Sequence, residues 1–435
     1  MLRFVYSPRF DLNVADLRLA LINYLLSRQR EEDFLLVVDD RSEMTDREAT
    51  RAAEAKELLD KFALHSERQL YRSEARNRYQ QLALHLLESG KAFLCTCEEK
   101  SEHSEESDEE DPRRYGGHCL RLSSEELRKI RDENLPFTIR IRKPAETIVW
   151  RDLLQGEFHA APEEVDHFVL RLSDGSPSRT FADAVDEMSN GISLVVEEER
   201  HLGEVPRQIH LRLSLGYEEE IAYAHIPPLL DETGRKFSPH GAPSVKALLA
   251  EGFLPDALIN YLLRLGNESL EGVFTLPEAV ESFELRGLSS LPVRFDLDEL
   301  RTLNREHLRR MDDRTLSLIF GFADASIGRL AKLYLEEAPT IRGLEKRIRK
   351  IFSPKNCEGL QGESMRRLSE AILSAPYYPD FDAFENDLGS RTGLQGETIR
   401  SSLYRLLTGS DEGPALPELY THIKSYITEV ARCQH

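Results

Sequence analysis

Three of the five cysteines in this chain of 435 residues lie close together in the sequence, at Cys95, Cys97 and Cys119. Five cysteines are too few to form a disulfide framework in a chain of this length. Thiolates at short spacings can bind a metal ion, and cysteines without a metal remain reduced thiols. The cluster therefore indicates either a metal site or a group of reduced cysteines.

Two further stretches carry polar side chains that could act on a ligand. Asn13 and Asp16 stand where a segment with helical periodicity begins, and either side chain can cap the N-terminus of that helix. The run KFSPH, from Lys236 to His240, has the composition of a surface turn.

A strand–helix–strand pattern at the N-terminus would position the first of these stretches. Arg3–Tyr6 has the composition of a short strand, and Ala15–Arg28 places apolar residues at the spacing of a helix that buries one stripe. Phe34–Val38 is an apolar run that ends in Asp39 and Asp40, as expected for a buried parallel strand whose C-terminal end meets a site. This order predicts the first half of a doubly wound sheet.

The rest of the chain divides into an insertion, a second sheet-forming part and a helical part. We predict charged helices over Arg47–Leu87, with a two-helix pair around Ser66–Arg68, and an inserted domain from Gly90 to about Asp166. After Pro243 the strand patterns disappear and helical patterns dominate, so we expect an all-α C-terminal region. Within the insertion we predict a strand at Phe137–Arg142. Between the insertion and Pro243 we predict strands at Phe168–Leu172 and Ile192–Val196, with a helix at Phe181–Met188.

The composition is that of an ordinary soluble protein, with 40% hydrophobic and 31% charged residues. The sequence has no run of about 20 apolar residues and no signal-peptide pattern, so we expect a cytoplasmic protein without a membrane span. The net charge of −20 argues against broad non-specific RNA binding but allows a local basic groove. Part of the acid lies in Glu98–Asp111, a low-complexity run expected to be a solvated, disordered loop.

Several longer strings point to a family. They are LLESGKAFLCTC (86–97), DGSPSRTFADAVDEMSNGIS (174–193), VPRQIHLRLSLGY (205–217), SVKALLAEGFLPDALINYLLRLG (244–266) and RFDLDELRTLNREHL (294–308). With them the chain resembles bacterial glutamyl-tRNA synthetase, a class I aminoacyl-tRNA synthetase, from Leu2 to nearly its C-terminus. The resemblance implies an α/β Rossmann-type catalytic domain with an inserted α+β domain, followed by an all-α domain similar to anticodon-binding domains. The implied bounds are 1–89 and 167–243 for the two halves of the Rossmann domain, 90–166 for the acceptor-stem-like insertion, 244–295 for a helical linker and 296–435 for the anticodon-binding-like domain.

In this family ATP is held by a HIGH-type motif at the start of the first helix and by a KMSKS-type loop. The matching residues are Asn13-Val14-Ala15-Asp16 and Lys236-Phe237-Ser238-Pro239-His240. Ala15 places a Cβ where the adenine would lie, and Asp16 places a carboxylate near the phosphates. A proline replaces the second lysine of the loop, and losing such a donor typically costs about 3–4 kcal/mol of transition-state stabilisation. The resemblance thus implies ATP as the cofactor but with damaged contacts.

The resemblance also assigns an amino-acid pocket. Arg3 and Ser7 match positions that contact the substrate glutamate, and Asp39 stands where the family has a glutamate. Glu197 replaces an arginine that recognises a substrate carboxylate, and Arg179 replaces a neighbouring tyrosine. At roughly 4 Å and an effective dielectric near 20, a unit-charge pair is worth about 4 kcal/mol. This reversal of charge predicts poor glutamate binding unless Arg179 takes over the lost role.

Zinc-bearing members of the family arrange their ligands like Cys95, Cys97, Tyr115 and Cys119. We therefore expect a structural zinc site, with His118 as an alternative fourth ligand.

The partner that the resemblance implies is tRNA, although Tyr404 replaces an arginine on the anticodon-binding side. Three hypotheses follow. The leading one is a divergent paralogue with lost or reduced adenylation that binds tRNA or a protein, for example an active synthetase. The second is a ligase that activates a cationic or neutral amino acid or an amine. The third is an ordinary glutamate–tRNA ligase with atypical motifs.

Overall fold

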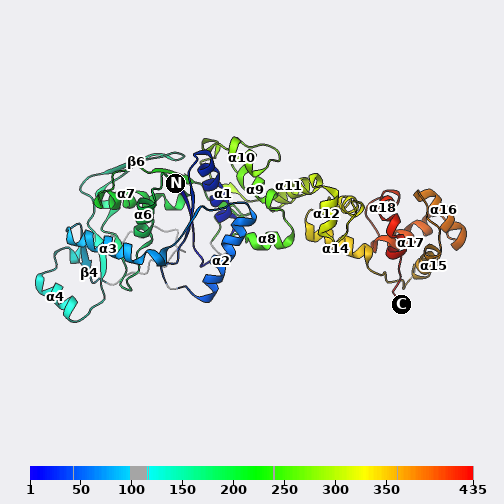
Figure 1. Cartoon of the computed structure of the whole chain (residues 1–435), viewed down its shortest axis with the longest axis horizontal. Coiled ribbons are helices and arrows are strands. Elements are labelled where there is room, and N and C mark those ends of the chain that lie inside the picture. Colours follow the sequence, from blue (N-terminus) through cyan, green and yellow to red (C-terminus); the bar gives the residue numbers. More distant parts are fainter. Residues whose placement is uncertain (43, 98–114, 116, 239–240, 360, 435) are drawn as a thin grey trace. The chain divides into compact units, whose positions relative to one another are not determined.

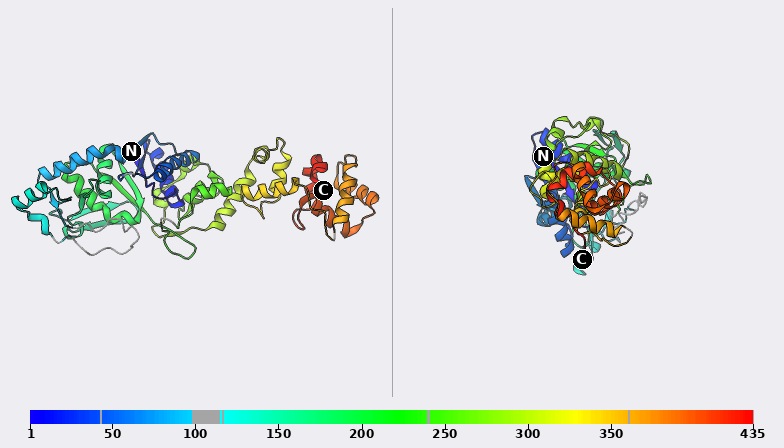
Figure 2. Two further views of the ribbon diagram at one scale, coloured as in Figure 1. Left: turned by 90° about the horizontal axis from the view of Figure 1, so that it is seen from below. Right: turned by 90° about the vertical axis from the view of Figure 1, so that its right-hand side faces the viewer.

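The computed structural model describes residues 1–42, 44–97, 115, 117–238, 241–359 and 361–434, which form two compact units. The first unit comprises Met1–Lys246 and Ile259–Asp296, and the second comprises Ala247–Leu258 and Leu297–His435. The acidic run predicted at Glu98–Asp111 lies outside the described residues. Figure 1 and Figure 2 show the ribbon coloured along the sequence.

A parallel three-stranded sheet begins the first unit. Its strands are β1 (Leu2–Tyr6), β2 (Phe34–Val38) and β3 (Arg68–Tyr71), in the order β1-β2-β3. Helix α1 (Val14–Gln29) makes the crossover from β1 to β2, so the predicted strand–helix–strand start is confirmed. All five residues of β2 are buried, as their continuous apolar sequence requires in a parallel sheet.

The helix pair predicted around Ser66–Arg68 is wrong. Helices α2 (Asp46–Lys61) and α3 (Arg76–Glu88) are present, but β3 lies between them and pairs with β2. Strand β3 reads RQLY and its first two residues are exposed, so it lacks the apolar pattern of an internal strand.

The second sheet has the order β7-β6-β10-β9, with β9 (Leu194–Glu198) and β10 (Ala222–Ile226) parallel. Strands β6 (Ile148–Asp152) and β7 (Gly156–Ala160) form an antiparallel pair beside β10. The Ser193 N–H donates to the Met1 carbonyl at 3.0 Å, so the chain entering β9 lies beside the start of β1. The carboxyl ends of β1, β2 and β9 therefore meet along one edge. Helices α6 (Arg179–Asn190) and α7 (Val205–Ser214) flank β9 in sequence, and the predictions of a strand at Ile192–Val196 and a helix at Phe181–Met188 are confirmed.

A third, antiparallel sheet joins β4 (Ala92–Cys95), β5 (Thr138–Ile141) and β8 (Val169–Arg171). The strand predicted at Phe137–Arg142 is thus confirmed. The strand predicted at Phe168–Leu172 is also present, but it pairs with β5 rather than with a strand of the parallel sheets. Short helices of this region are η2 (His118–Arg121), α4 (Ser124–Asp132) and α5 (Pro162–Val165).

Helices dominate after Pro243, but one short strand remains. Strand β12 (Val293–Arg294) pairs with β11 (Leu229–Leu230), which corrects the prediction that strands end at Pro243. Helices α8 (Val245–Glu251), α9 (Pro255–Arg264) and α10 (Leu276–Ser282) precede it. None of the described helices is long and apolar enough to cross a membrane.

From Leu297 onward, the described part of the second unit contains helices and loops but no strand. One isolated β-bridge joins Lys355 and Cys433. Leu344, Ile348 and Leu403 contribute to its buried core. Cys357 and Cys433, the two cysteines outside the cluster, form a disulfide with their Cα atoms 5.6 Å apart. The helices are α11 (Leu297–Arg310), α12 (Asp313–Ile319), α13 (Ser326–Lys332), α14 (Ile341–Phe352), α15 (Gly362–Leu373), α16 (Phe381–Thr392), α17 (Gly396–Thr408), α18 (Leu416–Ile423) and α19 (Ile427–Val430).

Candidate active site

A cavity of about 500 Å³ lies at the edge where the strands of the first unit end and α1 begins. Open α/β sheets commonly bind ligands at this edge. Of the residues predicted for the site, seven line the cavity and two, Arg3 and Glu197, do not. The seven are Ser7, Asn13, Asp16, Asp39, Arg179, Lys236 and Ser238.

Helix α1 begins with its own N-terminal donors already occupied. The Asn13 side-chain oxygen accepts the N–H groups of Ala15 at 2.8 Å and Asp16 at 3.1 Å. In return, the Asp16 carboxylate accepts the Asn13 N–H at 3.1 Å, which completes a capping box. Burial raises the pKa of Asp16 to about 7. The helix cap that the sequence allowed is therefore present, and it uses donors that a bound phosphate would need.

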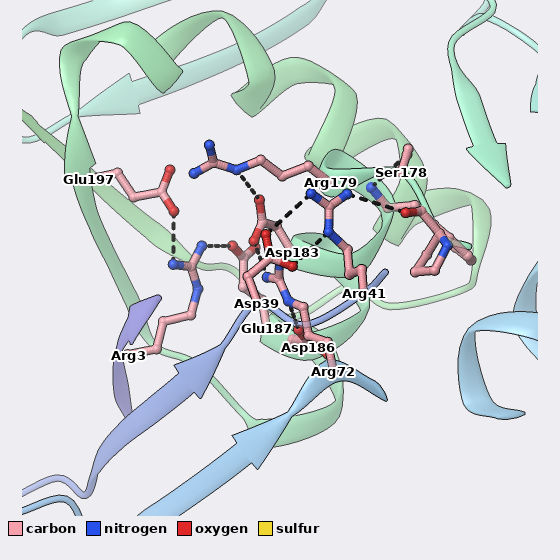
Figure 3. Close-up of polar contacts among 12 residues, drawn as sticks. Arg3, Asp39, Arg41, Arg72, Ser178, Arg179, Asp183, Asp186, Glu187 and Glu197 are labelled. Carbon is pink, nitrogen blue, oxygen red and sulfur yellow. Dashed lines mark hydrogen bonds and ion pairs between the residues drawn. The ribbon is translucent and has the colours of Figure 1, made fainter. Parts of the chain in front are cut away.

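Arg3 is buried below the cavity, and each of its two terminal nitrogens pairs with a carboxylate. Its guanidinium lies 2.5 Å from Glu187 and 2.8 Å from Glu197, and Figure 3 shows Glu197 pointing at it. Burial alone would raise the pKa of Glu197, but the charge of Arg3 outweighs burial and holds this pKa well below its usual range. Glu187 also pairs with Arg212 at 2.8 Å.

Asp39, at the end of β2, is paired within the protein in the same way. Its carboxylate lies 2.7 Å from Arg41 and 3.2 Å from Arg72 (Figure 3). Burial opposes ionisation of Asp39, but Arg72 and Arg41 lower its pKa to about 2. Arg179 approaches Asp183, with its Nε 3.5 Å from the carboxylate.

The acidic residues that neutralise these arginines were not predicted from the sequence. Asp183, Asp186 and Glu187 lie on α6 and are buried, and Arg72 pairs with both aspartates. Charged residues are rarely buried without partners. Three acidic residues within the otherwise apolar helix string FADAVDEM were the available signal.

The loop that follows β11 carries the predicted Lys236 and Ser238. Lys236 is exposed at the cavity and forms an isolated bridge with Leu230. The Ser238 carbonyl accepts the Gly241 N–H at 2.9 Å. Pro239 and His240 lie outside the described residues.

The four residues predicted as zinc ligands lie together. The sulfur atoms of Cys95, Cys97 and Cys119 all lie within 4.8 Å of one another. The Cys95 thiol donates toward the Tyr115 hydroxyl at 3.7 Å, and the His118 Nδ1 lies 3.8 Å from the Cys119 sulfur. Burial would raise the pKa of Cys119, but His118 and the other hydrogen bonds lower it to about 6, whereas burial raises the pKa of Cys97 to about 12, so the cluster favours one thiolate, at Cys119. This donor set fits a tetrahedral metal site.

Comparisons with known proteins agree with this architecture. Residues 1–302 match the family model described as "tRNA synthetases class I (E and Q), catalytic domain". The chain is 44% identical to a protein of Sulfurovum sp. named glutamate–tRNA ligase 2, over 99% of this chain and 100% of that protein. It is 36% identical to glutamate–tRNA ligase 1 of Campylobacter jejuni, again over 99% and 100%.

A solved structure is similar over the whole chain. The glutamate–tRNA ligase of Elizabethkingia meningosepticum, crystallised with its amino acid, aligns with a TM-score of 0.79 and 21% identity, covering 99% of this chain and 97% of that one. The fold is therefore a Rossmann-type catalytic region followed by a helical C-terminal region. With the family model and the full-length relatives, it follows that this chain belongs to the class I glutamyl-tRNA synthetase family.

Proposed function

We propose that this chain is a cytoplasmic member of the family in which glutamate adenylation is lost or severely reduced, and that it acts by binding tRNA or a protein partner. One observation carries the proposal. Arg3, which the resemblance assigns to glutamate binding, is engaged by Glu187 and Glu197 of the chain itself.

The charges around Arg3 explain why glutamate would bind poorly. A substrate carboxylate gains from Arg3 only if the guanidinium has charge and donors to spare. Two buried carboxylates already surround it, and a third would meet repulsion of about 4 kcal/mol from each at close range and an effective dielectric near 20. Asp39 has no free charge to offer the substrate amine either, because Arg41 and Arg72 neutralise it.

The start of α1 supports the same proposal on the ATP side. The N–H groups of Ala15 and Asp16 bond to Asn13, so they are not available to a phosphate. The Ala15 side chain lines the cavity, and the resemblance places the adenine of ATP at this position. Losses at separate parts of one site compound when they are independent.

The binding role rests on an intact fold and on family membership. The family acts on tRNA, and both units of this chain keep well-packed buried cores. In the second unit, however, several arginines are paired with carboxylates, such as the exposed Arg400 with Glu385 at 2.7 Å and the half-buried Arg305 with Glu336 at 2.6 Å. A tRNA would have to compete with these pairs, so we expect its binding to be weak and to fall steeply with salt.

The test is ATP–pyrophosphate exchange over all proteinogenic amino acids, with total tRNA from the source organism present. Silence from folded protein supports the proposal. Exchange with glutamate would instead support an active glutamate–tRNA ligase, a reading favoured by the full-length similarity to proteins of that name. Exchange with another amino acid alone would support a ligase with a new substrate, a reading favoured by the cavity that remains beside Lys236.

We further propose that Cys95, Cys97, Tyr115 and Cys119 hold a structural zinc ion. The support is that three sulfur atoms and one hydroxyl lie close together. The distances between these atoms would have to shorten only slightly for all four to bind one tetrahedral ion. The zinc would tie β4 to the segment at Cys119 and would take no part in catalysis.

A further inference from the structure

The two cysteines outside the cluster, Cys357 and Cys433, form a disulfide in the second unit. We propose that this pair is a redox modification site: a cellular dithiol reduces it, and reduction releases the Cys433 segment (residues 430–434) from the helices that it covers. This role goes beyond the proposed function. It uses only the cytoplasmic location proposed above, because disulfides of cytoplasmic proteins are usually transient and respond to redox conditions.

Backbone hydrogen bonds hold the Cys433 segment against the loop after α14. The Lys355 N–H donates to the Arg432 carbonyl at 2.8 Å, and the Gln434 N–H donates to the Lys355 carbonyl at 2.8 Å. Cys357 follows Lys355 by two residues, and Cys433 lies between Arg432 and Gln434. The disulfide therefore closes the same junction as these two hydrogen bonds.

The Cys433 segment covers apolar side chains of the second unit. Val430 and Ala431 are fully buried and belong to its core. The Ser369 hydroxyl of α15 donates to the Ala431 carbonyl at 2.6 Å. Helix α19, which ends at Val430, contacts α14, α15 and α17. Release of the segment would therefore open the apolar face between these three helices, in the unit on which the proposed binding role depends.

The side chain of Lys355 favours release once the disulfide is broken. Lys355 is 5% exposed, and its amine donates to the carbonyls of Ile351 and Val430. In the part of the chain that the structure describes, no carboxylate pairs with this amine, and burying a charge without a counter-charge costs free energy. Burial accordingly lowers the pKa of Lys355 to about 7. Opening returns the amine to water, so the disulfide holds closed a junction that the buried amine opposes.

The sulfur of Cys433 is the one that a reductant would reach. Cys357 is 3% exposed, whereas Cys433 is half-buried. A thiolate of the dithiol attacks the Cys433 sulfur, and the Cys357 sulfur leaves as a thiolate that takes up a proton. The second thiol of the dithiol loses its proton and attacks its partner sulfur in the mixed disulfide, which frees Cys433. Two electrons and two protons thus pass to the protein, and the dithiol leaves as a disulfide.

Hydrogen–deuterium exchange of the full chain, before and after dithiothreitol in native buffer, tests the proposal. We expect the Lys355 and Gln434 amides to exchange at least about tenfold faster after reduction, because release of the segment breaks both of their hydrogen bonds. The Gly328 amide is the control within the same unit, because it donates to the Ser317 hydroxyl at 2.6 Å and has no bond to the segment. Its exchange rate should not change.

A double variant, Cys357→Ala with Cys433→Ala, separates this pair from the Cys95 cluster, which keeps its three thiols. We expect the double variant to exchange like the reduced chain and not to respond to dithiothreitol. If the double variant does not fold, the unchanged chain in its two redox states still decides.

Three results would overturn the proposal. The first is alkylation of both Cys357 and Cys433 without reductant, even after treatment with oxidised glutathione. The second is a disulfide that dithiothreitol reduces only in denaturant. The third is reduction that leaves exchange at Lys355 and Gln434 unchanged, or that accelerates Gly328 equally, since the whole unit would then open. Failure of the proposed function is a separate result, because it would appear as pyrophosphate exchange with an amino acid in either redox state.

Discussion

Arg3 on β1 and Glu197 on β9 form a buried ion pair across neighbouring strands, with 2.8 Å between the guanidinium and the carboxylate. Arg3 is 1% exposed and Glu197 is 5% exposed, so water screens the pair little. The second terminal nitrogen of Arg3 faces Glu187. The positive charge of Arg3 is therefore neutralised by carboxylates of the protein itself. Removing one of these two carboxylates should make part of that charge available to a ligand.

The first prediction is that Glu197→Gln restores affinity for glutamate. The amide keeps the shape of the side chain but removes one negative charge next to Arg3. We expect glutamate to bind at least about tenfold tighter, since a unit charge at close range is worth roughly 1–4 kcal/mol. The free energy of unfolding should fall by about 1–3 kcal/mol because a charged hydrogen bond is lost. Titration calorimetry and urea denaturation measure the two quantities.

Glu199→Gln provides the matched control, because Glu199 lies two residues further on and, among the described residues, forms no ion pair with Arg3. Equal glutamate affinity in the two variants would show that Glu197 is not what keeps the substrate out.

The second prediction concerns Asp16 and pH. Burial raises its pKa to about 7 in the folded chain, against about 4 in the unfolded chain. Between these values the folded state holds a proton that the unfolded state has lost, so the contribution of Asp16 to stability falls as pH rises from about 4 to about 7. Asp16→Asn keeps an oxygen to accept the Asn13 N–H but does not titrate. We expect the variant to be more stable than the unchanged chain at pH 8, by about 1–2 kcal/mol after allowance for partial exposure, and nearly equal at pH 4.

Urea denaturation at both pH values measures this difference. A variant that is less stable at pH 8 would mean that the ionised carboxylate stabilises the helix start and that its pKa is not raised.

Local signals in the sequence predicted the local structure of the site. The run at Phe34–Val38 and the cap at Asn13 depend on neighbours a few residues away, so pattern and side-chain chemistry were sufficient. Strand β3 was not predicted, because it is an edge strand of mostly polar residues and lacks the alternation of apolar and polar residues that indicates a strand.

The charge pairing of the site could not be predicted in the same way. Arg3 and Glu197 are 194 positions apart by number (197 − 3), and only the assembled sheet brings β1 and β9 side by side. The resemblance placed both residues in one pocket. It did not show that Glu187 would share Arg3, because no sequence pattern reports which buried charges face one another.

The third prediction is that the chain contains about one equivalent of zinc and that Cys97→Ser abolishes it. The Cys97 sulfur lies 3.6 Å from that of Cys119, so its loss removes a ligand from the centre of the cluster. We expect the variant, and the unchanged chain treated with a chelator, to melt at a lower temperature, because metal binding contributes to folding. Elemental analysis and thermal denaturation test this. Cys357→Ser, at the disulfide of the second unit, is the control and should leave the zinc content unchanged. If the unchanged chain contains no zinc, the proposal of a zinc site is wrong.

The last prediction is that Glu336→Gln strengthens tRNA binding. Glu336 accepts Arg305 at 2.6 Å and Arg309 at 2.8 Å, so one carboxylate holds two arginines of α11. Exposed pairs of this kind contribute at most about 1 kcal/mol to stability, so the variant should fold normally. If these arginines face RNA, their release should raise affinity for total tRNA several-fold at low salt and steepen the fall of log affinity with log salt by up to about 1. Fluorescence anisotropy between about 50 and 200 mM salt measures both effects. Glu345→Gln frees only Arg349 on α14 and removes the same charge. Equal gains in the two variants would trace the effect to net charge alone, and no gain in Glu336→Gln would remove this face of α11 from any tRNA contact.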